Sequence, residues 1–194
     1  MDSKKAIVLE MIQVHKDLLS DFERNGLTSV AQAAKRLIDC IEAGGCIYLC
    51  GNGGSAADAQ HIAAELVGRF RRDRRGLPAV ALTTDTSALT SISNDYGFET
   101  IFTRQVEALV RKGDILWAFS TSGTSKNILA AVELARKNGA SILAFTGRVA
   151  SPLEAMADVT ICVNGPTSSV QEIHQLAYHI LCDLVEEHFV SKES

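Results

Sequence analysis

The stretch CGNGGSAADAQH, residues 50–61, places a glycine-rich turn between a short apolar run and a helical pattern. The apolar run before it, residues 46–50, has the length of a buried strand, and the small residues of the turn favour a switch from strand to helix. The same order of apolar run, polar turn and helical pattern recurs along the chain. Further apolar runs lie at residues 79–82, 115–119, 142–145 and 159–163. Five apolar runs alternating with helices predict a five-stranded parallel sheet covered on both faces, a three-layer α/β sandwich.

Helices are also predicted outside the alternating region. Two amphipathic helices precede the first strand, over about residues 3–43, with Thr28 or Ser29 as the cap of the second. This pair exceeds what the sandwich needs, so we expect it to pack against the sandwich and against neighbouring subunits. The last helix is expected over residues 168–190. Because no linker or repeat interrupts the pattern, the chain is predicted to form one domain, residues 1–194.

The composition excludes several classes of protein. The 194 residues are 46% hydrophobic, which is enough for one core without disulfides. Lys and Arg number 19 against 23 Asp and Glu, so no overall positive field would attract nucleic acid or an anionic membrane. Five cysteines form an odd set without a CxxC pair, which fits free thiols in a reducing compartment. No apolar stretch is long enough to cross a bilayer and no secretory signal is recognised, so a cytoplasmic location is expected.

Two loops of the predicted sheet have the composition of a phosphate site. Residues 51–55, GNGGS, let backbone N–H groups at a helix start approach an anion, and Asn52 could add side-chain contacts. Residues 120–125, STSGTS, offer five hydroxyls and one glycine before a helix that begins near Lys126. Ordinary strand-to-helix turns use the same residue types, but parallel strands bring both loops to one sheet edge. A phosphorylated small molecule is therefore the predicted ligand.

Two other ligands fit the sequence less well. Residues 51–56 contain a degenerate dinucleotide fingerprint, but Asp85 lies too far along the chain to serve as its ribose acid. A dinucleotide would also leave the hydroxyl-rich loop unused. A basic cluster could touch nucleic acid, although a short basic run on an acidic chain is more often a solvated turn. The cluster comprises Arg69, Arg71, Arg72, Arg74 and Arg75.

Polar side chains share one face of the helix expected over residues 55–70. They are Asp58, His61, Glu65 and Arg69, at three- and four-residue steps. His61 and Glu65 could bind one metal ion together, or Glu65 could act as a proton-transfer base beside a substrate. Glu65 and Arg69 could instead form an ordinary ion pair on a solvated face. The spacing alone leaves these alternatives open.

The last helix carries a second polar stripe among apolar residues, formed by Gln171, Gln175 and His179. Polar groups in such surroundings require hydrogen-bond partners. A buried histidine with one partner would explain His174, His179 or His188 equally well. Spacing therefore does not select among the three histidines.

A polar turn is predicted at residues 94–97, NDYG, after a short helical stretch at residues 87–93. Asn94 and Asp95 could hydrogen-bond sugar hydroxyls from this turn. The same two residues are also common in turns that bind nothing.

Several segments together resemble the phosphoheptose isomerases, a family of SIS (sugar isomerase) domain proteins. The longest runs from the glycine-rich turn to Glu65. The other matching segments are residues 81–87 (ALTTDTS), 94–97 (NDYG), 104–106 (RQV), 120–123 (STSG) and 171–174 (QEIH). The resemblance covers nearly the whole chain and implies a flavodoxin-like SIS fold.

The resemblance also implies an activity, a cofactor and partners. Members of the family are cytoplasmic homotetramers that convert the ketose sedoheptulose 7-phosphate to the aldose D-glycero-D-manno-heptose 7-phosphate, the first step toward the heptose of bacterial lipopolysaccharide. One zinc ion per subunit is implied, with His61, Glu65, Gln171 and His179 as ligands and with Glu65 and His179 as catalytic residues. The implied substrate contacts are Asn52, Gly53, Gly54, Ser55, Glu65, Asn94, Asp95, Ser120, Thr121, Ser122, Ser125 and Gln171.

The sequence departs from the family at one position and leaves two alternatives. Ser169 stands where relatives often carry a basic residue, so a sugar or phosphate contact is expected to be missing. A related branch of the family binds a replication-initiation protein as a tetramer, without isomerase chemistry or a need for Glu65. Another phosphorylated sugar could also be the substrate. As an isomerase, the protein would use Glu65 to move a proton between C1 and C2 and His179 as the acid toward the carbonyl oxygen.

Overall fold

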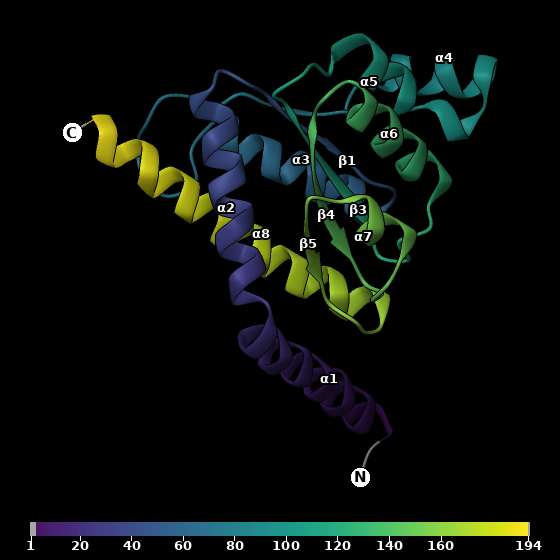
Figure 1. Ribbon diagram of the computed structural model, residues 1–194. Coiled ribbons are helices and arrows are strands. Elements are labelled where there is room, and N and C mark those ends of the chain that lie inside the picture. The colour runs from purple at the N-terminus through teal and green to yellow at the C-terminus, as the bar shows by residue number, and fades with distance from the viewer. Residues whose placement is uncertain (1–2, 194) are drawn as a thin grey trace.

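The computed structural model describes residues 3–193 and has a central parallel sheet with helices on both faces (Figure 1). The strands are β1 (Ile47–Cys50), β2 (Ala79–Ala81), β3 (Ile115–Ser120), β4 (Ser141–Thr146) and β5 (Val159–Cys162). They pair in the order β2-β1-β3-β4-β5, and every pair is parallel. This is the flavodoxin-like strand order, and it confirms the predicted five-stranded three-layer sandwich.

Helices α2, α3 and α8 cover one face of the sheet, and α5, α6 and α7 cover the other. A parallel sheet needs both covers because its strands are apolar on both faces. The helices are α1 (Ser3–Asn25), α2 (Leu27–Glu42), α3 (Gly54–Val67), α4 (Thr86–Tyr96), α5 (Thr103–Leu109), α6 (Lys126–Lys137), α7 (Pro152–Met156) and α8 (Thr167–Glu193), with a short 3-10 helix, η1 (Phe98–Thr100).

Each face of the sheet carries its own core. Successive side chains of a strand point to opposite faces of the sheet. In β3, Trp117 and Phe119 point to the α8 side, where both pack against Phe145 of β4. Leu116 and Ala118 of the same strand point to the opposite side, toward α6. Burying one large apolar side chain contributes about 1.5–3 kcal/mol. These cores fix the ends of the strands and therefore the loops that follow them.

The start of α2 differs from the prediction. Thr28 and Ser29 do not cap this helix, which follows Gly26 directly and has no side-chain cap. The N–H of Gly26 donates to the carbonyl of Phe22 in α1, and its carbonyl accepts from the N–H of Val30. The glycine therefore serves both helices at a sharp bend, and no separate capping turn fits between them.

Helix α3 is shorter than predicted. It ends at Val67, followed by Gly68 as its C-cap, whereas the sequence pattern continued to Phe70. The N–H groups of the three residues after Arg69 donate to the carboxylate of Glu186 instead of continuing the helix. Arg69 and Phe70 therefore lie in a loop.

Helix α4 is longer than predicted. Asp85 caps its start by accepting a hydrogen bond from the N–H of Ala88 at 2.9 Å. The helix then continues through Asn94 and Asp95, because the first residue that favours a break is Gly97, at φ 89°. The predicted turn at residues 94–97 is wrong, since three of its four residues, Asn94, Asp95 and Tyr96, lie in the last turn of the helix.

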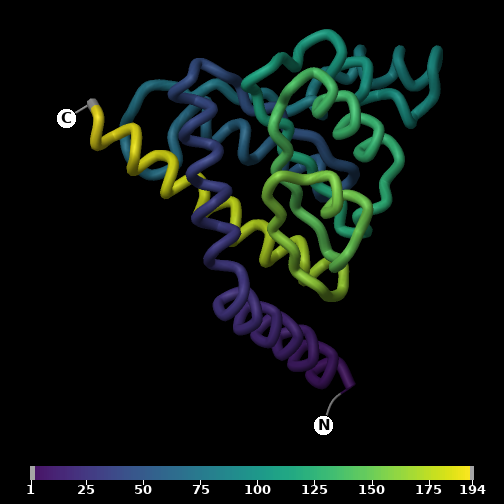
Figure 2. The backbone as a smooth tube through the Cα atoms, in the orientation of Figure 1, coloured from purple at the N-terminus to yellow at the C-terminus, as the bar shows by residue number. Residues whose placement is uncertain are grey.

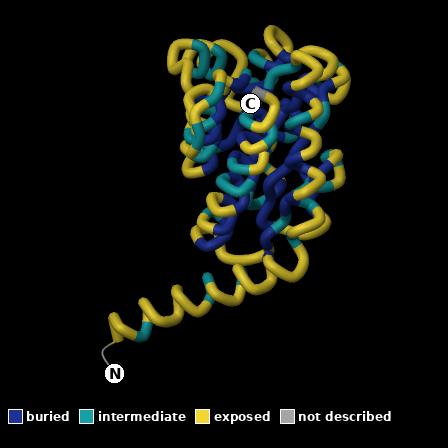
Figure 3. The backbone as a smooth tube through the Cα atoms, turned by 90° about the vertical axis from the view of Figure 1, so that its left-hand side faces the viewer, coloured by how far each residue is buried: buried dark blue, intermediate teal, exposed yellow. Residues whose placement is uncertain are grey.

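Helix α1 projects from the rest of the molecule (Figures 1 and 2). Phe22 is its one buried residue among those described, and Figure 3 shows the helix exposed along nearly its whole length. Near its middle, the ring of His15 lies 3.0 Å from the carboxylate of Glu172 in α8. Large apolar side chains that are about half exposed or more lie on α1, namely Ile7, Val8, Leu9, Met11 and Ile12. No described helix meets the length and apolarity that a membrane span requires.

Candidate active site

The first predicted phosphate loop joins β1 to α3 and contacts the start of α8. Ser55 is buried, and its N–H donates to the carbonyl of Asn52 at 3.0 Å. The amide of Gln171 packs so closely on Gly54 that a Cβ there would lie 2.5 Å from the Gln171 nitrogen. The absence of a Cβ at Gly54 lets the Gln171 amide approach this closely, and the contact places the first turn of α3 beside the second turn of α8.

The second predicted phosphate loop joins β3 to α6 and gathers hydroxyl groups. The Ser120 Oγ lies 3.0 Å from the Ser125 Oγ and 3.3 Å from the Ser122 Oγ. Gly123 has φ +67°, and a Cβ on it would lie 2.3 Å from the Cβ of Ser151, so only glycine fits the turn. These hydroxyls bond mainly to one another and can rotate to donate to an anion.

Two asparagines tie the two loops together. The amide nitrogen of Asn52 donates to the Asn127 oxygen at 2.9 Å, and the Asn127 nitrogen donates back to the Asn52 oxygen at 2.8 Å. Asn127 is buried, and its oxygen also accepts the N–H of Ile128. The expectation that both loops meet at one sheet edge is confirmed. Asn127 was absent from the predicted site, although an amide two residues beyond a hydroxyl loop was the signal available.

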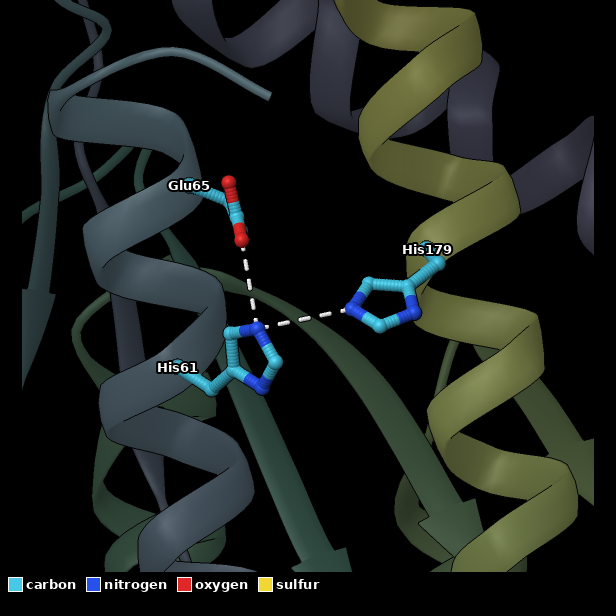
Figure 4. Close-up of side chains that lie close together, drawn as sticks. All are labelled: His61, Glu65 and His179. Carbon is cyan, nitrogen blue, oxygen red and sulfur yellow. Dashed lines mark hydrogen bonds and ion pairs between the residues drawn. The ribbon is translucent and has the colours of Figure 1, made fainter. Parts of the chain in front are cut away.

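A histidine–glutamate–histidine cluster lies between α3 and α8 (Figure 4). The His61 Nε2 is 3.1 Å from a carboxylate oxygen of Glu65 and 3.5 Å from the Nε2 of His179. One ligand atom from each residue lies within 4.8 Å of the others, and all three side chains are partly exposed. Two imidazoles and one carboxylate with an open side are a donor set that suits catalytic zinc. The residues present therefore fit a zinc ion.

The surroundings of His179 favour its neutral form. Burial lowers its pKa, a protonated His61 lowers it further, and the Glu65 carboxylate acts in the opposite direction. The Phe70 ring stacks on the imidazole with centroids 5.4 Å apart. A neutral imidazole keeps a lone pair for a metal or can accept a proton.

The other two C-terminal histidines serve different contacts. His174 is buried, which lowers its pKa to about 4, and its Nε2 lies 3.3 Å from the carbonyl of Thr146. His188 lies 2.7 Å from the carboxylate of Glu42 in α2. Position in the fold thus separates three histidines that spacing treated as equivalent.

Three predicted site residues lie apart from the cluster. The amide of Gln171, in α8, packs on Gly54 of α3. Gly54 lies seven residues before His61 in α3, so Gln171 does not reach the cluster. Asn94 donates to Asp95 at 2.8 Å, and both are exposed at the end of α4. Figure 1 shows α4 at the edge of the molecule, away from α8.

The arginine cluster has a structural partner that the sequence did not reveal. The fully buried Glu186 carboxylate accepts three backbone N–H groups at 2.6–2.7 Å and lies 3.5 Å from the Nε of Arg74. Burial alone would raise the pKa of Glu186, but these N–H donors and the Arg74 guanidinium lower it on balance. Arg74 also donates to the carbonyl of Glu65 at 2.8 Å. Glu186 and Arg74 therefore fix the end of α3, the helix that carries His61 and Glu65.

Comparison with known proteins gives a consistent set of relatives. A family model described as SIS domain matches residues 11–147. The phosphoheptose isomerase of Roseiflexus sp. (strain RS-1) is 47% identical over 186 residues, covering 95% of this chain and 94% of that protein. The phosphoheptose isomerase of Desulfovibrio desulfuricans is 56% identical over 160 residues, covering 82% and 76%. The solved phosphoheptose isomerase from Neisseria gonorrhoeae has a TM-score of 0.90 and 42% identity, covering 95% of this chain and 100% of that one.

Proposed function

The chain belongs to the phosphoheptose isomerases of the SIS-domain family, and we propose that it converts sedoheptulose 7-phosphate to D-glycero-D-manno-heptose 7-phosphate. It is an aldose–ketose isomerase of heptose biosynthesis, at the step that leads to lipopolysaccharide heptose. The observation that carries the proposal is the cluster of His61, Glu65 and His179 on helices that start at the hydroxyl-rich sheet edge.

The proposed cofactor is one zinc ion per subunit. His61, Glu65 and His179 would hold it, with Gln171 as a fourth ligand after movement of its amide away from Gly54. The proximity of the first three donor atoms supports the site. When bound, zinc supplies a Lewis acid that polarises the oxygens of the substrate.

The proposed chemistry moves one proton between neighbouring carbons. Glu65 removes a proton from C1 of the ketose while His179, which must first take up a proton because its surroundings favour the neutral imidazole, gives a proton to the carbonyl oxygen on C2, which forms an enediol. Glu65 then returns its proton to C2, and His179 takes the proton from the oxygen on C1, which leaves the aldehyde. Both side chains end in their starting states.

The phosphate is proposed to bind at the paired loops. Hydroxyls from Ser120, Thr121, Ser122 and Ser125 would donate to it, together with the backbone and side chains of residues 52–55. The interactions among these hydroxyls support this role, because a dianion would replace their mutual hydrogen bonds. Asn94 and Asp95 are proposed to contact sugar hydroxyls, and Ser169 supplies no charge where a relative's basic residue would.

The proposed assembly is a cytoplasmic homotetramer in which residues 1–194 form one SIS domain. The exposed apolar side chains of α1 support association, because a single copy leaves them in water. Sedimentation velocity on the purified protein would test the tetramer.

Isomerisation is tested by incubating wild-type protein and Glu65→Gln with sedoheptulose 7-phosphate and following the aldose by NMR. Metal content and circular dichroism are recorded on the same samples. Glu133→Gln is the matched control, since Glu133 is exposed on α6 and pairs with Lys137. We expect product from the wild type and the control alone. Folded, zinc-loaded wild-type protein that makes no aldose would overturn the proposal and favour another sugar phosphate.

A further inference from the structure

Two residues lie behind His61, on the side away from Glu65. Tyr178 of α8 is fully buried, and its hydroxyl lies 3.1 Å from the Nδ1 of His61. The same hydroxyl donates to a carboxylate oxygen of Asp58 at 3.4 Å. Asp58 lies one turn before His61 on α3. The three groups form a chain that ends at the imidazole of the cluster.

The direction of these hydrogen bonds follows from their chemistry. An ionised carboxylate can only accept, so Tyr178 donates its proton to Asp58. The tyrosine oxygen then accepts a hydrogen bond from the Nδ1–H of His61. Burial raises the pKa of Tyr178, and the charge of Asp58 raises it further, so the hydroxyl keeps its proton at neutral pH.

The consequence concerns the other ring nitrogen. When Nδ1 carries the proton of a neutral His61, the lone pair lies on Nε2, which faces Glu65 and His179. We propose that Tyr178 and Asp58 are positioning residues that hold His61 in the tautomer and orientation required for metal binding. This inference rests on the zinc site of the proposed function. Partners that hold the second nitrogen of a ligand histidine typically change metal affinity 10- to 100-fold.

The hydroxyl of Tyr178 can be tested separately from its ring. The ring packs edge-on against His61, with centroids 5.6 Å apart, and against His179, at 4.8 Å. Tyr178→Phe keeps these contacts and removes only the hydrogen-bonding oxygen. Tyr48→Phe is the matched control, because that hydroxyl donates to the carbonyl of Leu109, outside the cluster.

Two measurements on the full-length protein test the inference. Nitrogen-15 NMR of the histidine rings, in metal-free protein with neutral rings, reports which nitrogen of His61 carries the proton. Competition with a chromophoric chelator gives the zinc affinity. We expect protonated Nδ1 in the wild type and in Tyr48→Phe. In Tyr178→Phe we expect a mixture of tautomers and zinc binding weakened 10- to 100-fold.

The outcomes separate this inference from the proposed function. An unchanged tautomer with unchanged zinc affinity in Tyr178→Phe would overturn the positioning role while leaving the zinc site intact. Wild-type protein that binds no zinc would overturn the zinc site and, with it, the role of Tyr178 and Asp58 in metal binding. A wild-type His61 protonated on Nε2 would overturn the proposed hydrogen bond from its Nδ1–H to the Tyr178 oxygen.

Discussion

The two halves of the candidate site are built in different ways. The hydroxyl loop consists of consecutive residues, and several of its hydrogen bonds join residues two to five positions apart. The cluster joins His61 to His179, which are 118 positions apart on two helices. The hydroxyl loop is thus set by local sequence, and the cluster is set by the packing of α8 on α3. Variants that separate chemistry, packing and binding test this difference.

The largest effect is expected where the cluster is broken. His179→Gln should lower kcat about 10³-fold, because it removes a group that exchanges protons with the substrate. KM should change little, since the phosphate contacts remain. Steady-state isomerisation measures both constants. His188→Gln is the control, because His188 pairs with Glu42. A His179→Gln enzyme with normal kcat would remove the chemical role from this half.

The support of the cluster is tested next, at Glu186. Glu186→Gln should lower the free energy of unfolding by about 3 kcal/mol, because a buried charge facing Arg74 and three N–H groups is lost. Urea unfolding at pH 7 measures this, with the exposed Glu187→Gln as control.

The same pair of proteins should show a pH dependence. The folded-state pKa of Glu186 is below its ordinary value of 4.5, so its stabilising effect is present above that pH and is lost as the pH falls through the lowered value. The difference between wild type and Glu186→Gln should therefore shrink below pH 4.5. A difference that grows on acidification would contradict the assigned interactions.

The junction between the loops is tested at Asn127. Asn127→Ala should lower the free energy of unfolding by about 2 kcal/mol, because the Asn52 amide loses both of its hydrogen bonds to Asn127. It should also raise KM, since the loops lose their fixed spacing. Thermal unfolding and steady-state kinetics measure the two effects. Asn138→Ala removes one hydrogen bond at the other end of α6 and should leave KM unchanged.

The smallest effect is expected from a single hydroxyl. Ser122→Ala should raise KM about tenfold with kcat nearly unchanged, because one hydrogen bond to a charged phosphate contributes about 1.5 kcal/mol. Ser20→Ala on α1 is the control. A fall in kcat at constant KM would show that the loop takes part in the chemical step and would remove the contrast between the two halves.

Local patterns predicted the sheet, the helices and both loops, because strand burial and helix periodicity depend on residues that are close together in the sequence. The pairing of His61 with His179 was not readable from spacing, since it depends on how α8 crosses the sheet. Asn127, Tyr178 and Glu186 escaped prediction for the same reason. Each looks like an ordinary helix residue until packing supplies its partner. The end of α3 likewise depends on contacts with Glu186 of α8, whereas the bounds of α4 follow locally from Asp85 and Gly97.

The meeting of three helix starts has an electrostatic consequence. Contacts of Gly54 with Gln171, and of Asn52 with Asn127, bring the first turns of α3 and α6 and the second turn of α8 close together. The aligned peptide dipoles of each helix contribute roughly half a positive charge at its start. Three such ends approach the charge of a phosphate dianion in size, with opposite sign. A chain with net charge −4 thus gains a local attraction for phosphate from its backbone.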